Sequence, residues 1–295
     1  MRYFILFFTL MLFQTGCSPE ATDEPVGYPN SHLLLAADEL SELMQTDDIL
    51  LVDTREAITN EVIPGAVHFP SVRMLTDPDH PVSNFLVGPE KFVEMMRSLG
   101  LNNEDRIVIY DDGNALAAAR LFYALDYYGF SNAFILNGGV KAWLAEGLPV
   151  SDSFAETEQG NFQFEIQENR FCDINYIMEA VNDPDKIIFD VRSEGEYTGE
   201  VKRAERSGHI PNAVNLEWNN VLQDGDIPYF KPAQEIQELF AFKGITPEKE
   251  IIPHCQTNVR GSHAYFTLRL MGYDSVRPYE GSWAEYGNRE DTIVE

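Results

Sequence analysis

Cysteine is scarce in this sequence, and the cysteines it has lie far apart. The 295 residues include only Cys17, Cys172 and Cys255, and no two of them form a Cys-x-x-Cys pair. Three cysteines are too few for the framework of a disulfide-stapled domain, and without a close pair we expect no structural zinc site. Each cysteine therefore needs its own explanation, and we interpret Cys172, which lies outside any motif, as structural.

Positive charge is also in short supply. The chain has 21 Lys and Arg residues against 48 Asp and Glu residues, which gives a net charge of −27 at pH 7. A surface this acidic repels phosphate backbones, so we expect no nucleic-acid partner. An anionic small molecule would need a local cationic site that overcomes this field.

Long apolar runs are missing, apart from a short one at the start. Arg2 precedes an apolar run from Tyr3 to Phe13, which is well short of the ~20 residues that span a bilayer. The length matches the hydrophobic region of a signal peptide. We therefore expect the apolar start to direct export rather than to cross the membrane permanently.

The residues that follow, Gln14-Thr15-Gly16-Cys17, resemble the cleavage site of bacterial lipoproteins, although Gln14 stands where an aliphatic residue is usual. The resemblance implies that residues 1–16 are a signal peptide, that Cys17 is lipidated and that residues 17–31 form a tether. The protein is then expected to be extracytoplasmic, on the periplasmic side of a bacterial membrane, and held there by its lipid anchor only. An ordinary secretory signal with an incidental cysteine is the alternative.

The rest of the chain contains an internal repeat. Each half has a short apolar run that ends in Asp-x-Arg, first at Asp53–Arg55 and again at Asp190–Arg192. Three further pairs share one common spacing along the chain, namely Pro89 and Pro232, Gly129 and Gly272, and Gly138 and Gly281. A repeat over this length indicates two copies of one domain.

Short apolar strands alternate with helical segments in both halves, and this pattern predicts the fold class. It is typical of an α/β protein in which a mostly parallel sheet is flanked by helices, here in two tandem domains. The polar and acidic residues 151–170 interrupt the pattern and are predicted to be a linker. The domains are then residues 32–150 and 171–295.

The most informative feature is the loop that begins at Cys255. It follows the apolar strand Ile251–His254 and leads into the helical run Ala264–Met271. A loop at this end of a parallel strand directs backbone N–H groups and a helix dipole at one point, which stabilises an anion and lowers the pKa of a thiol. Arg260 adds a positive charge, and Asn258 tolerates the positive φ that a tight turn needs.

The first half provides a comparison. Cys255 precedes Gly272 by the same interval at which Asp112 precedes Gly129, the glycine equivalent to Gly272 in the repeat. The first loop therefore has neither thiol nor arginine, and we expect a catalytic second half and a structural first half. The alternative for Cys255 is a buried structural cysteine at a strand end.

Taken together, the Asp-x-Arg strands, the motif Gly208-His209-Ile210-Pro211-Asn212-Ala213, the Cys255 loop and the final Gly281-Ser282-Trp283 resemble the tandem-domain rhodanese family of sulfurtransferases. The resemblance implies that Cys255 takes a sulfur atom from an anionic donor as a persulfide and passes it to cyanide or a thiol. It implies no metal and no organic cofactor. The implied donor is thiosulfate or 3-mercaptopyruvate, and we favour thiosulfate.

Substrate-binding residues follow from the same resemblance. Arg192 resembles the family arginine that holds the donor's anionic group, with a salt bridge to Glu194 or Glu196 as its structural alternative. Arg55, in the first half, is expected to form an internal ion pair. The remaining predicted substrate-binding residues are those of the loop itself, Gln256, Thr257, Asn258, Val259 and Arg260.

Two other functions fit parts of this pattern. A phosphatase of the same broad fold needs Cys-x5-Arg around a tetrahedral phosphate, whereas Cys255 and Arg260 give the shorter Cys-x4-Arg, which suits a single sulfur atom. The second alternative is a protein without turnover, either a persulfide carrier or a binding module.

Overall fold

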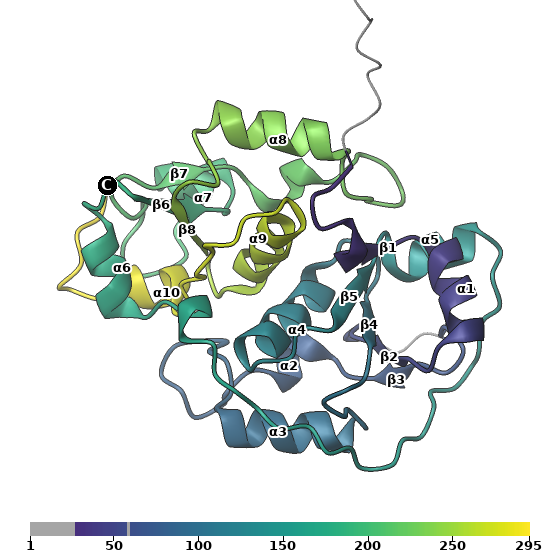
Figure 1. Cartoon of the computed structure of the whole chain (residues 1–295). Helices are drawn as coiled ribbons and strands as arrows, with labels where there is room; N and C mark the ends of the chain where they lie inside the picture. The colour runs from purple at the N-terminus through teal and green to yellow at the C-terminus, as the bar shows by residue number, and fades with distance from the viewer. Residues whose placement is uncertain (1–26, 58–59) are drawn as a thin grey trace, which may run out of the picture.

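The computed structural model describes residues 27–57 and 60–295 and shows two α/β domains packed side by side (Figure 1). The signal peptide, Cys17 and most of the predicted tether lie outside the described residues. No helix in the described part of the chain is both long enough and apolar enough to cross a membrane.

The first domain is built on a parallel sheet of five strands in the order β1-β5-β4-β2-β3. Its central strand β4 (Ile107–Tyr110) is buried at every residue, as expected for a continuous apolar run between two helical layers. The other strands are β1 (Leu34–Leu35), β2 (Leu50–Asp53), β3 (Val67–His68) and β5 (Ala133–Leu136).

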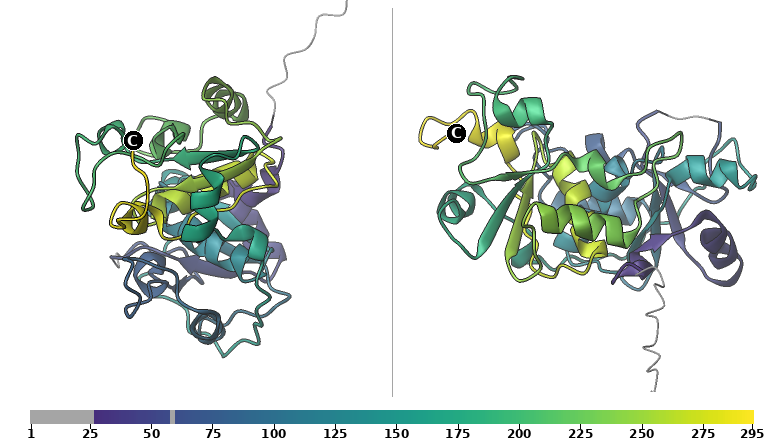
Figure 2. Two further views of the ribbon diagram at one scale, coloured as in Figure 1. Left: turned by 90° about the vertical axis from the view of Figure 1, so that its left-hand side faces the viewer. Right: turned by 90° about the horizontal axis from the view of Figure 1, so that it is seen from above.

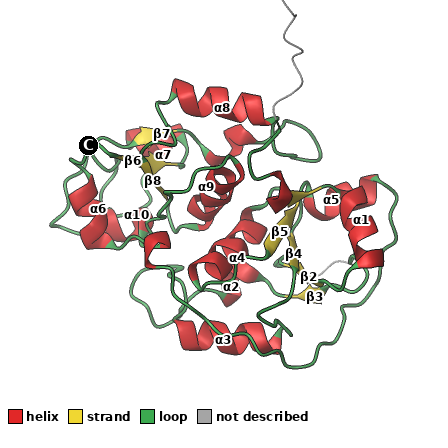
Figure 3. Cartoon of the chain, in the orientation of Figure 1, coloured by secondary structure: helices red, strands yellow, loops and turns green. Residues whose placement is uncertain are grey.

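Helices cover both faces of this sheet (Figure 3). On one face, α1 (Ala37–Thr46) and α5 (Gly139–Ala145) pack against strand residues such as Val108. On the other face, Ile109 packs with α3 (Pro89–Ser98) and α4 (Leu116–Tyr127). The short segments η1 (Ser31–Leu33) and α2 (Ser71–Met74) complete the domain.

The second domain repeats this plan with a smaller parallel sheet, ordered β7-β6-β8. Its strands are β6 (Lys186–Asp190), β7 (Val214–Asn215) and β8 (Glu250–His254). Its helices are η2 (Glu168–Arg170), α6 (Ile174–Ala180), α7 (Glu194–Thr198), η3 (Trp218–Val221), α8 (Ala233–Phe242), α9 (Val259–Leu270) and α10 (Ser282–Tyr286). The prediction of two tandem domains with mostly parallel, helix-flanked sheets is confirmed.

The equivalent helices α4 and α9 lie against each other between the two sheets (Figures 1 and 2). Phe122 meets Phe266 edge to face at 4.9 Å between ring centroids, and Tyr123 meets Tyr265 at 5.3 Å. One apolar core continues from the first domain through this helix pair into the second. The loops that precede the two helices are thereby brought to the domain interface.

Parts of the predicted linker and of the predicted tether are bound to the domains. Within residues 151–170, Phe162 is buried in the core of the first domain against Phe92 and Phe130. At the end of the predicted tether, the backbone N–H of Asn30 donates to Leu270 O at 3.1 Å. Residues 28–31 therefore belong to the folded body, since their polar groups find partners there.

Candidate active site

Cys255 directly follows β8 and is almost fully buried, with 1% of its surface exposed. Its backbone N–H donates to Ser282 Oγ at 3.3 Å, and its carbonyl accepts from the N–H of Trp283 at 2.9 Å. Ala284 N–H donates in turn to Gln256 O at 2.9 Å. The Gly281-Ser282-Trp283 segment thus fixes the backbone of the cysteine at the carboxyl end of the sheet.

The loop turns sharply at Asn258, which has a φ of 59° and caps α9. The prediction that this asparagine adopts a positive φ is confirmed. Its counterpart in the first domain, Ala115, has the same φ of 59° and caps α4. Because alanine gains nothing from this conformation, the shared turn is a property of the fold.

The first domain shows what this turn does to the backbone. There the carboxylate of Asp111, which is 3% exposed, accepts from the N–H groups of Gly113, Ala115 and Ala117 at 2.8, 3.1 and 3.1 Å. Ala118 N–H also lies at 3.4 Å from it. Burial raises the pKa of Asp111, and these N–H bonds oppose that rise. The turn therefore gathers N–H donors around one carboxyl group, as a helix N-terminus does around phosphate.

In the second domain, the repeat places His254 at the position of Asp111. Among the hydrogen bonds of the described residues, no carboxylate accepts from the corresponding N–H groups of residues 256, 258, 260 and 261. In the first domain the N–H groups of the turn bind the domain's own Asp111 side chain, whereas in the second domain the same turn lies beside a thiol. This difference supports an anion site at Cys255.

Arg260 is held by Glu196, a carboxylate that was considered above only as a partner of Arg192. Its guanidinium donates to both oxygens of Glu196, at 2.7 and 3.0 Å. Burial would raise the pKa of Glu196. The hydrogen bonds and positive charge of Arg260, together with the hydrogen bonds of Ser193, outweigh burial and lower the pKa to about 2. Burial likewise opposes the charge of Arg260, yet Glu196 and the Cys255 thiolate raise its pKa. Both groups are therefore ionised at neutral pH.

Glu196 was not among the predicted site residues, although the sequence contained a signal for it. Ser193 and Glu196 form the capping box that begins α7. This helix start fixes the carboxylate near the loop, and it also places Arg203 Nε at 3.5 Å from Glu196 Oε1. Arg203 is 58% exposed, so it offers positive charge at the outer edge of the site.

The guanidinium of Arg192, which we predicted to bind the donor, is engaged by groups inside the second domain. Its Nε lies 3.0 Å from both carboxylate oxygens of Asp190, and its Nη2 lies 2.6 Å from Oδ2. The guanidinium also donates to Gly208 O at 2.8 Å and stacks on the Trp283 ring. The partner is Asp190 rather than Glu194 or Glu196, because the side chain folds back onto the strand it follows.

The first domain repeats this arrangement without a thiol. Arg55 lies 2.6 Å from Asp53 and donates to Glu61 O at 2.9 Å, which confirms its predicted internal ion pair. Since the same contacts form where no catalytic loop exists, the Asp-x-Arg unit closes the end of the strand in both domains. We therefore interpret Arg192 as a structural residue.

The other predicted loop residues come together at the domain interface. Gln256 Nε2 donates to Arg203 O at 3.1 Å, and Val259 begins α9. Thr257 Oγ1 accepts from Asn84 Nδ2 of the first domain at 3.3 Å. The loop is thus bordered by both domains, and the sequence contained no signal for Asn84.

Two histidines near the loop are buried and neutral. Burial lowers the pKa of His254 to about 4 and that of His263 to about 3. Neither ring nitrogen of His263 has a partner among the described residues, and the ring stacks on Phe230 at 5.3 Å. Neutral, enclosed imidazoles of this kind fit a packing role.

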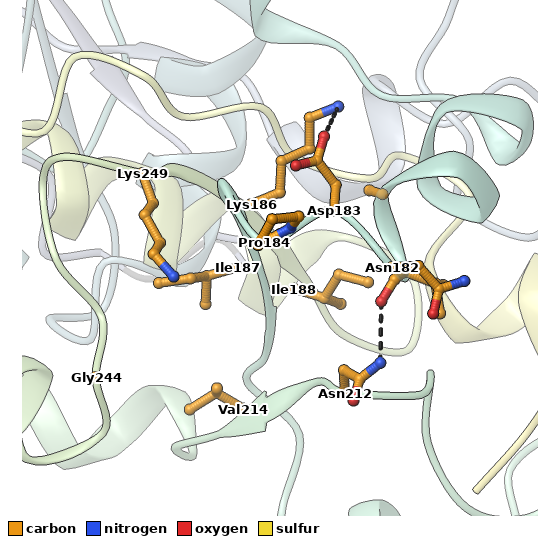
Figure 4. A pocket seen from close by; sticks show the side chains of 12 residues that line it. Asn182, Asp183, Pro184, Lys186, Ile187, Ile188, Asn212, Val214, Gly244 and Lys249 are labelled. Atoms are coloured by element: carbon orange, nitrogen blue, oxygen red, sulfur yellow. Dashed lines mark hydrogen bonds and ion pairs between the residues drawn. The ribbon is translucent and has the colours of Figure 1, made fainter.

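A separate hollow of about 430 Å³ lies in the second domain (Figure 4). Its lining includes Asp183, Lys186, Asn212 and Lys249. Lys186 is the first residue of β6, whereas Cys255 follows the last residue of the parallel strand β8. The hollow is therefore at the opposite end of the sheet from the thiol and does not belong to this site.

Comparisons with known proteins agree with this geometry. The family model described as the rhodanese-like domain matches residues 36–146 and 173–289. A thiosulfate sulfurtransferase of Azotobacter vinelandii is 33% identical over 89% of this chain and 97% of its own length. The sulfur carrier protein TtuD of Thermus thermophilus is 32% identical over 89% of this chain and 96% of its own.

Among solved structures, the chain is similar to SseA from Escherichia coli, which is described as a 3-mercaptopyruvate sulfotransferase with the rhodanese fold. The two share 28% identity with a TM-score of 0.76, over 85% of this chain and 98% of that one. The similarity therefore spans both domains rather than one.

Proposed function

The chain belongs to the rhodanese-like family as a tandem-domain sulfurtransferase, and from this premise we propose that Cys255 carries the transferred sulfur as a persulfide. The observation that supports this most directly is the shared turn of the two domains. In the first domain it surrounds the Asp111 carboxylate with N–H donors, and in the second it adjoins Cys255. A thiolate or the terminal sulfur of a persulfide is the anion that such donors stabilise.

The reaction has two halves. The Cys255 thiolate attacks the outer sulfur of thiosulfate, the S–S bond of the donor breaks, and sulfite leaves with the electron pair. The cysteine is then a persulfide anion. Cyanide or a thiolate attacks its terminal sulfur, and the new C–S or S–S bond releases the Cys255 thiolate for the next cycle.

The donor we favour is thiosulfate. Its charge matches Arg260 and the exposed Arg203, which both lie beside Glu196 at the loop. The identity of 33% to a protein named thiosulfate sulfurtransferase supports the same choice. Guanidinium groups also bind carboxylates, so 3-mercaptopyruvate is the comparison donor.

The test is turnover with each donor. We expect the purified protein to form thiocyanate from thiosulfate and cyanide, and to gain the mass of one sulfur atom on the peptide that contains Cys255. Cys255→Ser should lose turnover by a factor of about 10³ or more, because the hydroxyl is a poor sulfur acceptor. Cys172→Ser is the matched control and should retain activity, since Cys172 is buried in an apolar cluster that does not include Cys255.

Sulfur transfer to a protein partner, without turnover on small acceptors, is the second candidate. The similarity to a protein named a sulfur carrier favours it. A persulfide on Cys255 without thiocyanate formation would select this alternative. Absence of both, with the thiol shown to be reduced, would contradict the proposed function.

We also propose that Cys17 is lipidated and anchors the protein on the periplasmic side of a bacterial membrane. The support is the short apolar run and the Thr15-Gly16-Cys17 sequence. The full chain expressed in a bacterium with lipoprotein processing should partition with membranes, and Cys17→Ser should not. Recovery of both forms in the soluble fraction would contradict the anchor.

A further inference from the structure

A buried chain of polar side chains joins the first domain to the Cys255 loop. Arg120, on α4 of the first domain, donates to Glu280 through Nη2 at 2.6 Å and Nη1 at 3.2 Å. The other end of the chain is Asn258, whose Nδ2 donates to Glu280 Oε2 at 2.6 Å. All three residues are at most 1% exposed.

Further hydrogen bonds tie this chain to both domains. Leu86 N–H donates to Glu280 Oε1 at 2.8 Å, and Arg120 Nη2 donates to Asn84 O at 2.9 Å. On the other side, Arg120 Nη1 lies 3.4 Å from Ser262 Oγ, whose hydroxyl donates to the carbonyl of Asn258 at 2.6 Å. The carboxylate of Glu280 thus accepts from donors of both domains.

Asn258 is the residue whose conformation these contacts fix. Its φ of 59° is uncommon for a residue other than glycine, and a side-chain anchor offsets the cost. A Cβ atom added to Gly261 would lie only 2.2 Å from Asn258 Oδ1. The side-chain amide of Asn258 is therefore held between Gly261 and Glu280. A change at Glu280 therefore acts on the turn that presents the loop N–H groups.

The internal repeat provides a control for this arrangement. The spacing that relates the two halves pairs Arg120 with His263, Glu280 with Asn137 and Asn258 with Ala115. Within the described chain, none of these counterparts forms a corresponding ion pair, and neither ring nitrogen of His263 has a hydrogen-bond partner. The charged network is therefore present only on the side of the thiol, although both domains have the same turn.

We infer that Arg120 of the first domain is a positioning residue for the Cys255 loop, because it holds Glu280 and through it the Asn258 turn, and because its charge offsets that of Glu280 beside the thiolate. The inference rests on the proposed function for its effect on turnover. It also assigns a task to the first domain, whose equivalent loop has no thiol.

The charges that face Cys255 are few and paired. Arg260 reaches it from α9 with Glu196 as its partner, and His254 precedes it as a neutral imidazole. Burial would lower the pKa of Arg120, but Glu280 outweighs this effect, and the Cys255 thiolate also raises it. Loss of the Arg120 charge therefore leaves Glu280 as an uncompensated anion near the thiolate, which disfavours the ionised thiol.

The experiment measures the reactivity of Cys255 separately from turnover. Full-length protein is alkylated with iodoacetamide across a pH series, and modification of the Cys255 peptide is followed by mass spectrometry. We expect Arg120→Met to raise the midpoint of this profile by about one pH unit. We expect it to lower kcat/KM for thiosulfate by roughly 10²-fold, mainly through kcat, because the loop is misplaced while the groups that bind the donor remain.

Three further variants make the result decisive. Arg120→Lys keeps the charge and should recover much of the midpoint, and Arg120→Met with Glu280→Gln should recover it by removing both charges. Tyr265→Phe is the matched control, since it removes a bond to Asp126 across the same domain interface without touching the loop. It should lower the melting temperature and leave the midpoint in place.

Outcomes of this set separate the inference from the proposed function. Arg120→Met with a wild-type midpoint and kcat within about twofold would overturn the inference, whatever its melting temperature. If Arg120→Met does not fold, the same criterion applies to Glu280→Gln, which weakens the bonds of that side chain to Arg120 and Asn258. A shifted midpoint in a protein that turns over no donor would support the positioning role and contradict the sulfurtransferase.

Discussion

At the scale of single residues, the two Asp-x-Arg pairs show that an arginine which resembles a substrate-binding residue can have internal contacts instead. Arg192 and Arg55 have the same bidentate contact to the aspartate two residues earlier, and both donate to a backbone carbonyl, that of Gly208 and that of Glu61. Both guanidinium groups are at most 3% exposed. Breaking a buried pair from one side leaves an uncompensated charge, so the pair matters for stability rather than for substrate.

This interpretation predicts matched losses of stability. Arg192→Met and Arg55→Met should each lower the free energy of unfolding by about 3–5 kcal/mol, measured by urea denaturation. The KM for thiosulfate in folded Arg192→Met should stay near the wild-type value. A large rise in that KM with little loss of stability would instead support a donor-binding role for Arg192.

His263 gives a pH dependence that can be tested directly. Its pKa is lowered by burial to about 3, below the 6.5 of an unperturbed imidazole, so the unfolded chain binds the extra proton first as pH falls. The contribution of His263 to the free energy of unfolding is therefore fully present above about pH 6.5 and is lost as the pH falls toward 3. His263→Leu removes this contribution, and relative to the variant the wild type should lose about 2 kcal/mol between pH 7.5 and 5.

The measurement is urea denaturation of both proteins at several pH values. His254, which has a pKa of about 4, titrates in both and cancels in the difference. A difference that does not change with pH would mean that His263 is protonated to the same extent in the folded and unfolded chain.

At the scale of elements, the strand–turn–helix unit after β4 and β8 carries both the fold and the chemistry. The capping residues Ala115 and Asn258 share a φ of 59°, but only Asn258 has a side chain that is anchored. The same substitution at the two positions therefore has different consequences. A substitution at Ala115 changes only the conformational free energy of the turn. At Asn258 it also removes the hydrogen bond to Glu280 that holds the Cys255 loop.

Glycine at each position tests this distinction. Ala115→Gly should raise the free energy of unfolding by up to about 1 kcal/mol, because glycine adopts positive φ without the steric cost. Asn258→Gly keeps the permitted backbone but loses the bond to Glu280, and kcat should fall by about tenfold or more. Equal effects of the two variants on kcat would contradict the anchoring role of Asn258.

At the scale of the whole molecule, the two domains are joined by packing as well as by the linker. The core that contains Phe122 on α4 and Phe266 on α9 extends through both domains, and Phe162 of the linker segment is buried in it. Shared apolar burial couples the stability of one domain to that of the other. The catalytic loop therefore depends on the fold of a domain whose equivalent loop contains no thiol.

This continuity predicts a single unfolding transition. Calorimetry of the wild type should give one peak, with a van 't Hoff enthalpy close to the calorimetric enthalpy. Phe266→Ala should shift that whole peak, with a loss of about 3–5 kcal/mol. Two resolved peaks, of which only one moves in Phe266→Ala, would show that the domains unfold independently.

Local sequence was sufficient to predict the repeat, the parallel sheets, the loop at the end of β8 and the positive φ of Asn258. Each of these follows from hydrophobic period, turn chemistry or the constant spacing between the two halves, all of which can be read along the chain. The ion pair of Arg55 with Asp53 was also within reach, because the two side chains stand close together in the sequence.

Only the tertiary structure decided which charges meet at the site. Arg260 binds Glu196 and Arg120 binds Glu280 although each pair is far apart in the sequence, and no periodicity relates such partners. The reason is physical: a buried charge takes the partner that packing brings within hydrogen-bond distance. The start of α7 brings Glu196 to Arg260, and the packing of α4 against α9 brings Arg120 into the second domain. The sequence determined that a thiol would stand in the turn between β8 and α9, and the tertiary structure determined which residues hold that turn in place.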